Sequence, residues 1–225
     1  MKICVIIPAF NESREIAGLI KEIKENNPDV LVVDDGSVDS TGELALSSGA
    51  VVLRNPVNQG KGACLRKAFR YALEKDFDAV IIMDGDGQHL PEDLPNFISL
   101  AAHSDVDILV GNRMNQTKEM PIVRIATNRF MSWIISILSK QKIPDTQCGF
   151  RLIKRRALEK LDLKTVKFET ETEILIKASG LGFKIGSVPI KTVYRGQKSQ
   201  INPIVDTFRF IKFIIAVGRK GGPQS

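Results

Sequence analysis

The chain has 225 residues, 43% of them apolar, and a net charge of +6, so it is long enough to bury a substantial core in one compact domain. Its three cysteines, Cys4, Cys64 and Cys148, are far apart and form no Cys-x-x-Cys pair, which argues against a disulfide framework or a zinc site. The sequence contains neither a signal-peptide pattern nor an apolar run of about 18 residues. We therefore expect a cytoplasmic protein that does not span a membrane.

The charge is unevenly distributed along the chain. Residues 1–139 contain 14 Lys and Arg against 19 Asp and Glu, net −5, whereas residues 140–225 contain 18 against 7, net +11. A basic segment of this kind favours an anionic partner, such as a phosphorylated substrate or an anionic membrane surface. Its aromatic residues form no stacking series and no nucleic-acid-binding motif is present, so we expect no nucleic-acid partner.

Strand-like apolar runs alternate with helix-like segments along the chain. The expected strands are residues 3–8, 30–34, 50–54, 79–84, 106–111, a short one near 149–153, and 183–189. The expected helices are residues 13–26, 40–48, 61–75, 91–102, one within 122–139, and 169–179. This alternation predicts an α/β fold with a mostly parallel central sheet flanked by helices.

The fourth expected strand ends in the run Asp84-Gly85-Asp86-Gly87-Gln88. Side chains two residues apart on a strand point to opposite faces, so both carboxylates can reach one cation only if the chain turns at the two glycines. Oxygen ligands from Asp84, Asp86 and Gln88 suit Mg²⁺ or Mn²⁺. A solvated acidic turn is the alternative interpretation of this run taken alone.

The ends of the first three strands carry polar and glycine-rich segments, at residues 8–12, 34–37 and 58–62. The carboxyl ends of parallel strands meet at one edge of a sheet, where such sheets bind ligands. A carboxylate there can accept hydrogen bonds from a base or ribose, and a glycine-flanked helix N-terminus can meet a phosphate. The pattern predicts a nucleotide pocket, although Asp34, Asp35 and Ser37 taken singly could only cap a helix. Neither a dinucleotide fingerprint nor a P-loop is present.

Taken in order, residues 8–12, 34–37, 58–62 and 84–89 resemble an inverting family 2 glycosyltransferase of the GT-A fold, the nucleotide-diphospho-sugar transferase fold. Further along, residues 111–113, 145–151, 169–173 and 194–199 resemble the branch of dolichyl-phosphate mannose synthases and polyprenyl-phosphate hexosyltransferases. The resemblance covers nearly the whole chain. It implies a metal-dependent transfer of a hexose, mannose or glucose, from GDP-mannose or UDP-glucose to a polyprenyl phosphate.

The resemblance also implies roles for particular residues. The residues expected to bind the donor nucleotide sugar are Pro8, Phe10, Glu12, Asp35, Lys61, Asp84, Gly85, Asp86, Gln88 and Arg113, of which Asp84, Asp86 and Gln88 would hold the metal. The residues expected to serve catalysis are Asp86, Arg113, Asp145, Arg195 and Lys198. Arg195 and Lys198, with Ser199, would complete an anion site for the phosphates.

The chemistry of the acceptor decides whether a base is needed. A lipid phosphate is already anionic near neutral pH, so positioning and electrostatics would suffice and the sugar configuration would invert. A hydroxyl acceptor on a glycan would require a carboxylate base, for which Asp145, Glu171 and Glu173 are the candidates. Two other classes stay open at this point, a sugar-phosphate nucleotidyltransferase and a non-catalytic nucleotide-binding module.

Two segments have a residue pattern typical of helices that bind to a membrane surface. Met131, Ile134, Ile135 and Leu138 follow i, i+3, i+4, i+7, with Arg124, Arg129, Lys140 and Lys142 around them, a pattern typical of either an interfacial amphipathic helix or a core helix. Trp133 and the basic flanks favour the interface. Residues 202–225 are expected to form a C-terminal amphipathic basic helix and tail after a domain of residues 1–201. We therefore expect a peripheral protein on the cytoplasmic face of a membrane.

Overall fold

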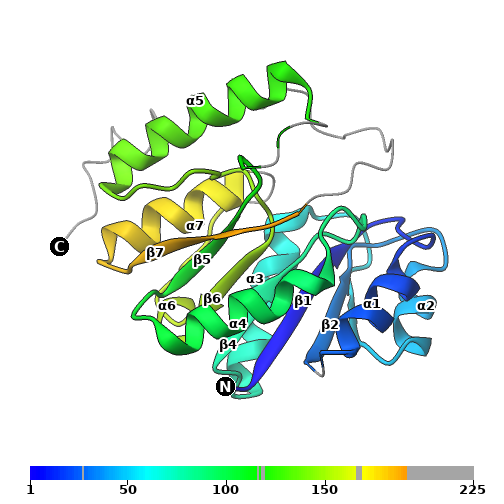
Figure 1. Ribbon diagram of the computed structural model, residues 1–225. Helices are drawn as coiled ribbons and strands as arrows, with labels where there is room; N and C mark the ends of the chain where they lie inside the picture. The colour runs from blue at the N-terminus through cyan, green and yellow to red at the C-terminus, as the bar shows by residue number, and fades with distance from the viewer. Residues whose placement is uncertain (27, 116, 118–119, 166–168, 192–225) are drawn as a thin grey trace.

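The computed structural model describes residues 1–26, 28–115, 117, 120–165 and 169–191 (Figure 1). Within them the chain forms one sheet of seven strands in the order β3-β2-β1-β4-β6-β5-β7. The strands are β1 (Ile3–Ala9), β2 (Asp29–Asp34), β3 (Val51–Arg54), β4 (Ala79–Ile82), β5 (Ile108–Asn112), β6 (Arg151–Lys154) and β7 (Ile185–Pro189). The helices are α1 (Ile16–Lys24), α2 (Thr41–Ser47), α3 (Lys61–Glu74), α4 (Leu94–His103), α5 (Ile122–Ser139), α6 (Arg155–Leu158) and α7 (Glu169–Gly180), with a 3₁₀ turn η1 (Pro91–Asp93).

The predicted mostly parallel sheet is confirmed, with one strand reversed. Strands β1 to β4 are parallel to one another, and β7 is parallel to β5. Strand β6 runs antiparallel to both β4 and β5, with Arg151 beside Ile82 and Val110. The chain therefore enters β6 at the same edge of the sheet where β4 and β5 end.

The strand order places a topological switch point between β1 and β4. The chain moves outward from β1 to β2 and β3, then returns past β1 to β4. Because parallel crossovers are right-handed, α1 and α2 cover one face of the sheet and α3 covers the other, as Figure 1 shows. The loops after β1 and β4 both lie at the carboxyl edge beside this switch point, where such sheets usually bind their ligands.

The central strands are buried on both faces because helices cover both sides. Strands β1, β2 and β4 are almost entirely buried and rich in Val and Ile, as a sheet covered on both faces requires. Helix α1 buries Ile16, Leu19, Ile20 and Ile23 at i, i+3, i+4, i+7. The functional loops thus extend from a rigid core.

Most boundaries shift by one to three residues from the sequence-based expectation, and two of these shifts affect the candidate site. Strand β4 ends at Ile82 rather than at 84, so Asp84 lies in the turn and not in the ladder. Helix α1 begins at Ile16 rather than at 13, because the backbone carbonyl of Glu12 accepts hydrogen bonds from Glu15 and Ile16 and a turn precedes the helix. The short helix α6 was not expected.

Helix α5 is the outermost element at the top of Figure 1 and packs against α7. Its buried residues are Asn128, Met131, Ser132, Ile135 and Ser139. The core-helix interpretation is therefore right for Met131 and Ile135, whereas Leu138 of the same predicted stripe is exposed. No helix in the described part of the chain is long and apolar enough to cross a membrane. The predicted C-terminal helix at 202–225 lies outside the described residues.

Candidate functional site at the carboxyl edge of the sheet

The loop after β1 is fastened to the loop after β2. The backbone N–H of Asn11 donates to Ser37 Oγ at 2.9 Å, and that of Glu12 donates to Thr41 Oγ1 at 2.8 Å. Asn11 adopts a left-handed φ of 58° and accepts a hydrogen bond from the N–H of Val38, a conformation that Asn tolerates better than most residues. Phe10, directly after the strand, stays partly exposed, and Pro8 lies within β1 opposite Val33.

The carboxylate of Asp35 shapes the loop that leads into α3. It accepts hydrogen bonds from the backbone N–H groups of Gln59 (2.9 Å) and Gly60 (2.8 Å) and from Asn55 Nδ2 (2.8 Å). Gly60 has a φ of 89°, which favours glycine, and the helix begins at Lys61. Asp35 thus positions Lys61. Its predicted contact with the base or ribose stays a prediction.

Lys61 joins two elements of the site. Its Nζ lies 2.5 Å from Asp84 Oδ1 and 2.7 Å from Glu171 Oε1 on α7. Burial disfavours the charged lysine, but the two carboxylates outweigh burial and raise the pKa of Lys61. Burial likewise opposes the charge of Asp84, and Lys61 is the main group that nevertheless lowers the pKa of that carboxyl. A fixed positive charge therefore stands at the N-terminus of α3, where the helix itself favours an anion.

Asp84, Asp86 and Gln88 all lie in the turn after β4, and Asp86 contacts Gln88 directly. Asp86 accepts the backbone N–H of Gln88 at 3.0 Å and its side-chain Nε2 at 2.8 Å. Gly87 supplies the turn with a φ of 69°, whereas Gly85 has no left-handed φ. No group of three His, Cys, Asp or Glu side chains among the described residues is arranged to hold a metal ion.

Glu12 adds a further carboxylate beside this turn. A Cβ on Gly85 would lie 3.4 Å from Glu12 Cγ. Burial, together with the charge of Asp86 and then Asp39, raises the pKa of Glu12 to about 7. Burial and Asp84 also raise the pKa of Asp86. Carboxylate oxygens with an excess of negative charge have the chemistry that a hard divalent cation prefers. The binding of Mg²⁺ or Mn²⁺ by Asp84, Asp86 and Gln88 stays a prediction.

Arg113 and Asp145 form a buried ion pair at the end of β5. Arg113 Nε and Nη2 lie 2.7 and 2.9 Å from the two carboxylate oxygens of Asp145, which also accepts the backbone N–H of Arg113 and Asn128 Nδ2. Burial disfavours the charge of Asp145, but Arg113 and these hydrogen bonds lower its pKa. A carboxylate with four donors is suited to positioning Arg113 and poorly suited to accepting a proton. The predicted contact of Arg113 with donor phosphates stays a prediction.

The three carboxylates considered as bases differ in this structure. Glu173 accepts hydrogen bonds from Lys164, from the backbone and side chain of Thr165, and pairs with Lys177. Glu171 uses Oε1 for Lys61, while its buried Oε2 has no hydrogen-bond partner in the described part of the chain. Of Asp145, Glu171 and Glu173, only Glu171 thus keeps an uncommitted oxygen at the site.

Three contributors to the site were not anticipated. His89 accepts the backbone N–H of Asp84 at Nδ1 (3.3 Å), and burial lowers the pKa of its imidazole to about 4. Gly149, just before β6, has no room for a side chain, because a Cβ would lie 2.4 Å from Asp84 Oδ2. The charge of Arg124 on α5 offsets a small part of the rise that burial and Asp84 cause in the pKa of Asp86. His89 lies within the run 84–89 that carries the family resemblance, only five residues after Asp84. Gly149 and Arg124 reach the turn from far along the chain, so the spacing within each motif contained no signal for their contacts. Arg195 and Lys198 lie outside the described residues.

The protein is thus an α/β protein with carboxylates and a lysine at the carboxyl edge of its sheet, beside the topological switch point. Residues 4–162 match the family described as Glycosyl transferase family 2. The chain belongs to this family, and it is a glycosyltransferase with the GT-A fold. The match argues against the nucleotidyltransferase and the non-catalytic binding module.

Several relatives are similar over most of the chain. The UDP-N-acetylglucosamine–dolichyl-phosphate N-acetylglucosaminyltransferase of Methanococcus voltae is 30% identical over 215 residues, covering 85% of this chain and 86% of that protein. The undecaprenyl-phosphate mannosyltransferase of Micrococcus luteus is 31% identical over 210 residues, covering 87% and 85%. A crystal structure of glucosyl-3-phosphoglycerate synthase from Mycobacterium tuberculosis with Mn²⁺, UDP and glucosyl-3-phosphoglycerate has a TM-score of 0.71 at 22% identity, covering 100% of this chain and 81% of that one. The likeness to this structure shows the fold.

Proposed function

We propose that the protein transfers a hexose from a nucleoside-diphosphate sugar to a polyprenyl phosphate with inversion at the sugar carbon. The observation that carries the donor part of this proposal is the contact of Lys61 with Asp84, in which a cation lies beside a carboxylate at the N-terminus of α3. A diphosphate bound with a metal needs both. The acceptor half is supported by similarity over 85% and 87% of the chain to proteins named for dolichyl and undecaprenyl phosphate.

The donor site would be divided between the loops described above. Pro8, Phe10, Glu12 and Asp35 would line the base and ribose, with Phe10 exposed enough to stack. Asp84, Asp86 and Gln88 would hold Mg²⁺ or Mn²⁺, which would neutralise charge on the diphosphate. Lys61 would add positive charge there, and so would Arg113, which Asp145 orients.

The transfer needs little acid–base chemistry from the protein. One bond forms between an anionic oxygen of the lipid phosphate and the sugar carbon, while the bond from that carbon to the diphosphate breaks on the opposite face. The electron pair of the broken bond leaves with the diphosphate, whose charge Lys61 stabilises. Positioning of two anions is then the main task of the protein. The reaction would take place on the cytoplasmic face of a membrane.

Transfer to a hydroxyl group is the second candidate, favoured by one observation. Glu171 Oε2 is buried and without a hydrogen-bond partner among the described residues, as a general base awaiting an acceptor hydroxyl would be. Lys61 Nζ pairs with the other oxygen, Oε1, at 2.7 Å. The two candidates share one donor site and differ in what Glu171 does.

The test is a panel of GDP-mannose, UDP-glucose and UDP-N-acetylglucosamine, each with Mn²⁺ and either a short polyprenyl phosphate or soluble sugars as acceptors. The panel includes three sugars because the two relatives above are named for different ones. We expect transfer to the polyprenyl phosphate, from GDP-mannose in preference to UDP-glucose, and a product of inverted configuration by NMR. Efficient transfer to a soluble sugar with none to the lipid would establish the second candidate instead.

A further inference from the structure

Arg151, the first residue of β6, is a buried positive charge to which the proposed reaction gives no task. Its side chain is fully buried, and no larger side chain in the described part of the chain is. Burial disfavours the charged guanidinium and lowers the pKa of Arg151, so its place in the interior has a cost. A buried charge is tolerated where hydrogen bonds satisfy its donors.

The guanidinium group of Arg151 donates to three backbone carbonyls. Nε donates to Cys148 O at 2.8 Å, Nη2 to Thr146 O at 2.7 Å, and Nη1 to Glu171 O at 2.6 Å. The first two carbonyls lie in the loop before β6, and the third lies in the first turn of α7. Because a planar guanidinium donates in fixed directions, one side chain holds the loop and the helix in a single arrangement.

Each of these two segments carries a carboxylate that holds a cation of the candidate site. Asp145, in the loop before β6, pairs with Arg113 at 2.7 Å, and Glu171 pairs with Lys61 at 2.7 Å. The side chains of Arg113 and Lys61 are only 7% and 17% exposed. Each cation is oriented by its carboxylate, and each carboxylate is carried by a segment that Arg151 holds. The positions of both cations therefore depend on the hydrogen bonds of Arg151.

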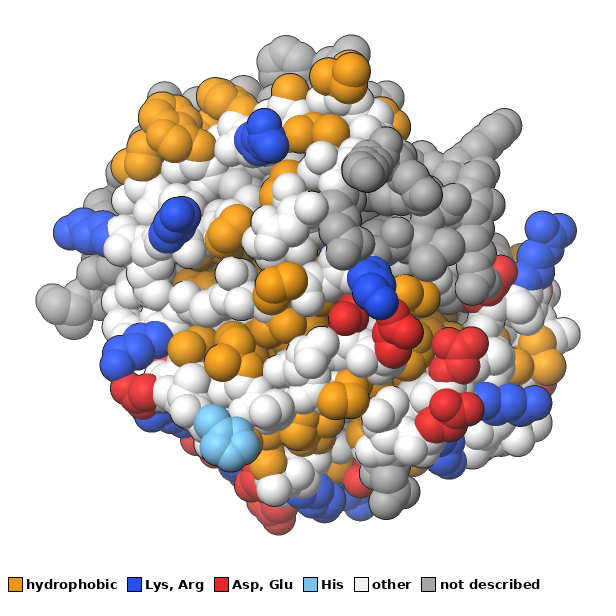
Figure 2. All heavy atoms as spheres, in the orientation of Figure 1, with side chains coloured by type: hydrophobic (Ala, Val, Ile, Leu, Met, Phe, Trp, Pro, Cys, Tyr) orange, Lys and Arg blue, Asp and Glu red, His pale blue; other side chains and the backbone are white. Residues whose placement is uncertain are grey.

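Fixed positions matter more for this site than the charge of the molecular surface. Figure 2 shows that the Lys and Arg side chains on the face it displays are spread over the surface rather than gathered in one patch. A diphosphate binds most tightly to cations that are already held where its oxygens will lie, because less side-chain freedom is then lost on binding. Two largely buried cations with a shared support meet this requirement.

We propose that Arg151 is a positioning residue that holds Lys61 and Arg113 in one geometry for the diphosphate of the donor, an inference that rests on the proposed function. Arg151 is fully buried, so it acts through the backbone of the loop before β6 and of α7 rather than by contact with a substrate. Its fork of donors is required in addition to its charge. Lysine, with a single ammonium group, cannot replace it.

The variant Arg151→Lys keeps the charge and loses the fork. We would measure by calorimetry the affinity of the full chain for UDP and for GDP, each with Mn²⁺. The affinity of Arg151→Lys should fall about tenfold, a coupling typical of residues in one network. Leu152→Ala, at the next residue of the same strand, removes a buried side chain and is the control for lost stability. Its affinity should equal that of the wild type.

A second measurement separates positioning from a general effect on the fold. The same substitution is made in Lys61→Met and in Arg113→Met, each of which lacks one of the two cations. Arg151→Lys should weaken binding only about threefold in either background, because half of its effect acts through the missing cation. If Arg151→Lys does not fold, Arg151→Gln, which keeps an amide donor, allows the same comparison in a stabilising osmolyte such as trimethylamine N-oxide.

Three results would overturn the inference. Equal affinity of Arg151→Lys and the wild type would show that the fork is not needed, while the proposed function would stand. A loss of equal size in all three backgrounds, or in Leu152→Ala, would show that Arg151 supports the fold as a whole. A wild type that binds neither UDP nor GDP would overturn the proposed function and this inference with it.

Discussion

The side-chain amine of Lys61 lies 2.5 Å from Asp84 Oδ1, so the first residue of α3 neutralises the carboxylate that follows β4. A metal ion bound by Asp84 would compete with this ion pair, whereas the contact of the lysine with Glu171 would remain. The charge of the lysine would then become available to the diphosphate.

Replacing Lys61 with Met tests this relationship. We expect the affinity for a nucleoside diphosphate with Mn²⁺ to fall at least about tenfold, since an adjacent positive charge is lost. The free energy of unfolding should fall by up to about 3 kcal/mol, because Glu171 is left buried without its partner. Calorimetry and urea unfolding measure the two effects. Lys75→Met, at the exposed end of the same helix, should change neither, and equal affinity in the two variants would contradict the role of Lys61.

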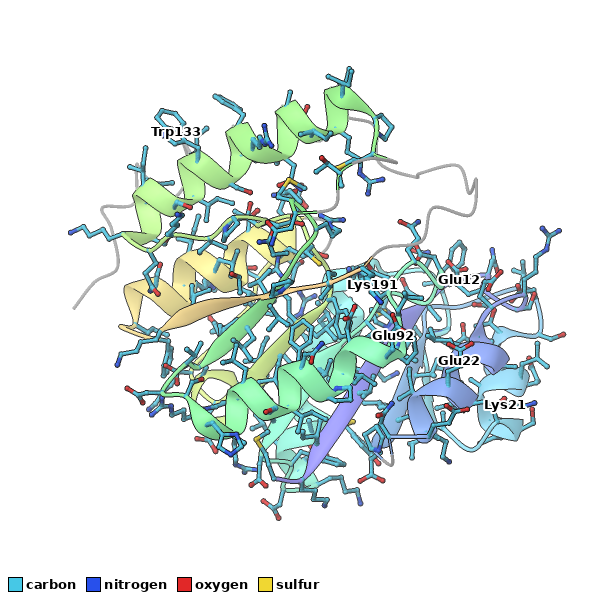
Figure 3. All side chains as sticks on the ribbon, in the orientation of Figure 1. Glu12, Lys21, Glu22, Glu92, Trp133 and Lys191 are labelled. Carbon is cyan, nitrogen blue, oxygen red and sulfur yellow. The ribbon has the colours of Figure 1, made fainter. Side chains whose placement is uncertain are left out.

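Asp86→Ala tests the metal site. Transfer should be lost while the fold persists, because Asp86 lies in an edge turn and contributes little to the core. Thermal unfolding without metal should match the wild type, and stabilisation by Mn²⁺ should disappear. Glu22→Ala, an exposed carboxylate of α1 labelled in Figure 3, is the control. Full activity of Asp86→Ala in a chelator would refute the metal hypothesis.

The pKa of Glu12, raised from 4.5 to about 7 by burial and then Asp86, makes stability depend on pH. Between these two values the folded protein keeps a proton that the unfolded chain releases, so this contribution to stability is full below pH 4.5 and is lost as the pH rises to 7. In Glu12→Gln, which cannot ionise, urea unfolding without metal should show a flatter dependence across this window. A slope equal to that of the wild type would show that Glu12 is not the group responsible.

The acceptor question is settled by ranking three variants. If the acceptor is a lipid phosphate, Arg195→Ala and Lys198→Ala should reduce transfer far more than Glu171→Gln, because anions are positioned and no alcohol is deprotonated. If a hydroxyl is the acceptor, Glu171→Gln should instead cost about 10²- to 10⁴-fold in kcat, the range for loss of a general base. Initial rates at saturating donor distinguish the two rankings.

Gly149→Ala tests the close approach of the segment before β6 to Asp84. The added methyl would lie 2.4 Å from Asp84 Oδ2, so the carboxylate or the strand must shift. We expect weaker binding of Mn²⁺ and some loss of stability, both measurable in thermal unfolding with and without metal. Gly18→Ala on α1, where nothing lies within 4 Å, should not weaken either. Normal metal affinity in Gly149→Ala would show that Asp84 is not held by this contact.

The fold was predictable to the extent that periodicity and strand ends encode it. The apolar runs at β1, β2 and β4 are buried on both faces, which makes them easy to recognise, and the turns after them are marked by Gly and Asp. The reversal of β6 was not predictable, because the pattern of Arg151 to Lys154 is the same in either direction. The direction of β6 depends on the edge of the sheet at which the segment between β5 and β6 ends.

The candidate site was predictable as a set of loops but not as a set of contacts. The turn holding Asp84 and Asp86 follows from two glycines close by in sequence. The pairing of Arg113 with Asp145, 32 positions apart, depends on how α5 returns the chain to the sheet. The same holds for Lys61 and Glu171, which come from α3 and α7. A contact between two single charged residues far apart in the chain produces no periodic pattern in the sequence, so it could not be predicted.

The reversed strand β6 also has an evolutionary consequence. Since β5 ends and β6 begins at the same edge of the sheet, residues 113–150 form an excursion whose two ends are neighbours. Such an excursion can be lengthened, shortened or exchanged without altering the register of any strand in the half that carries the nucleotide loops. Exchange of this one segment could therefore change the acceptor specificity of an ancestral enzyme while its nucleotide-binding half stayed the same.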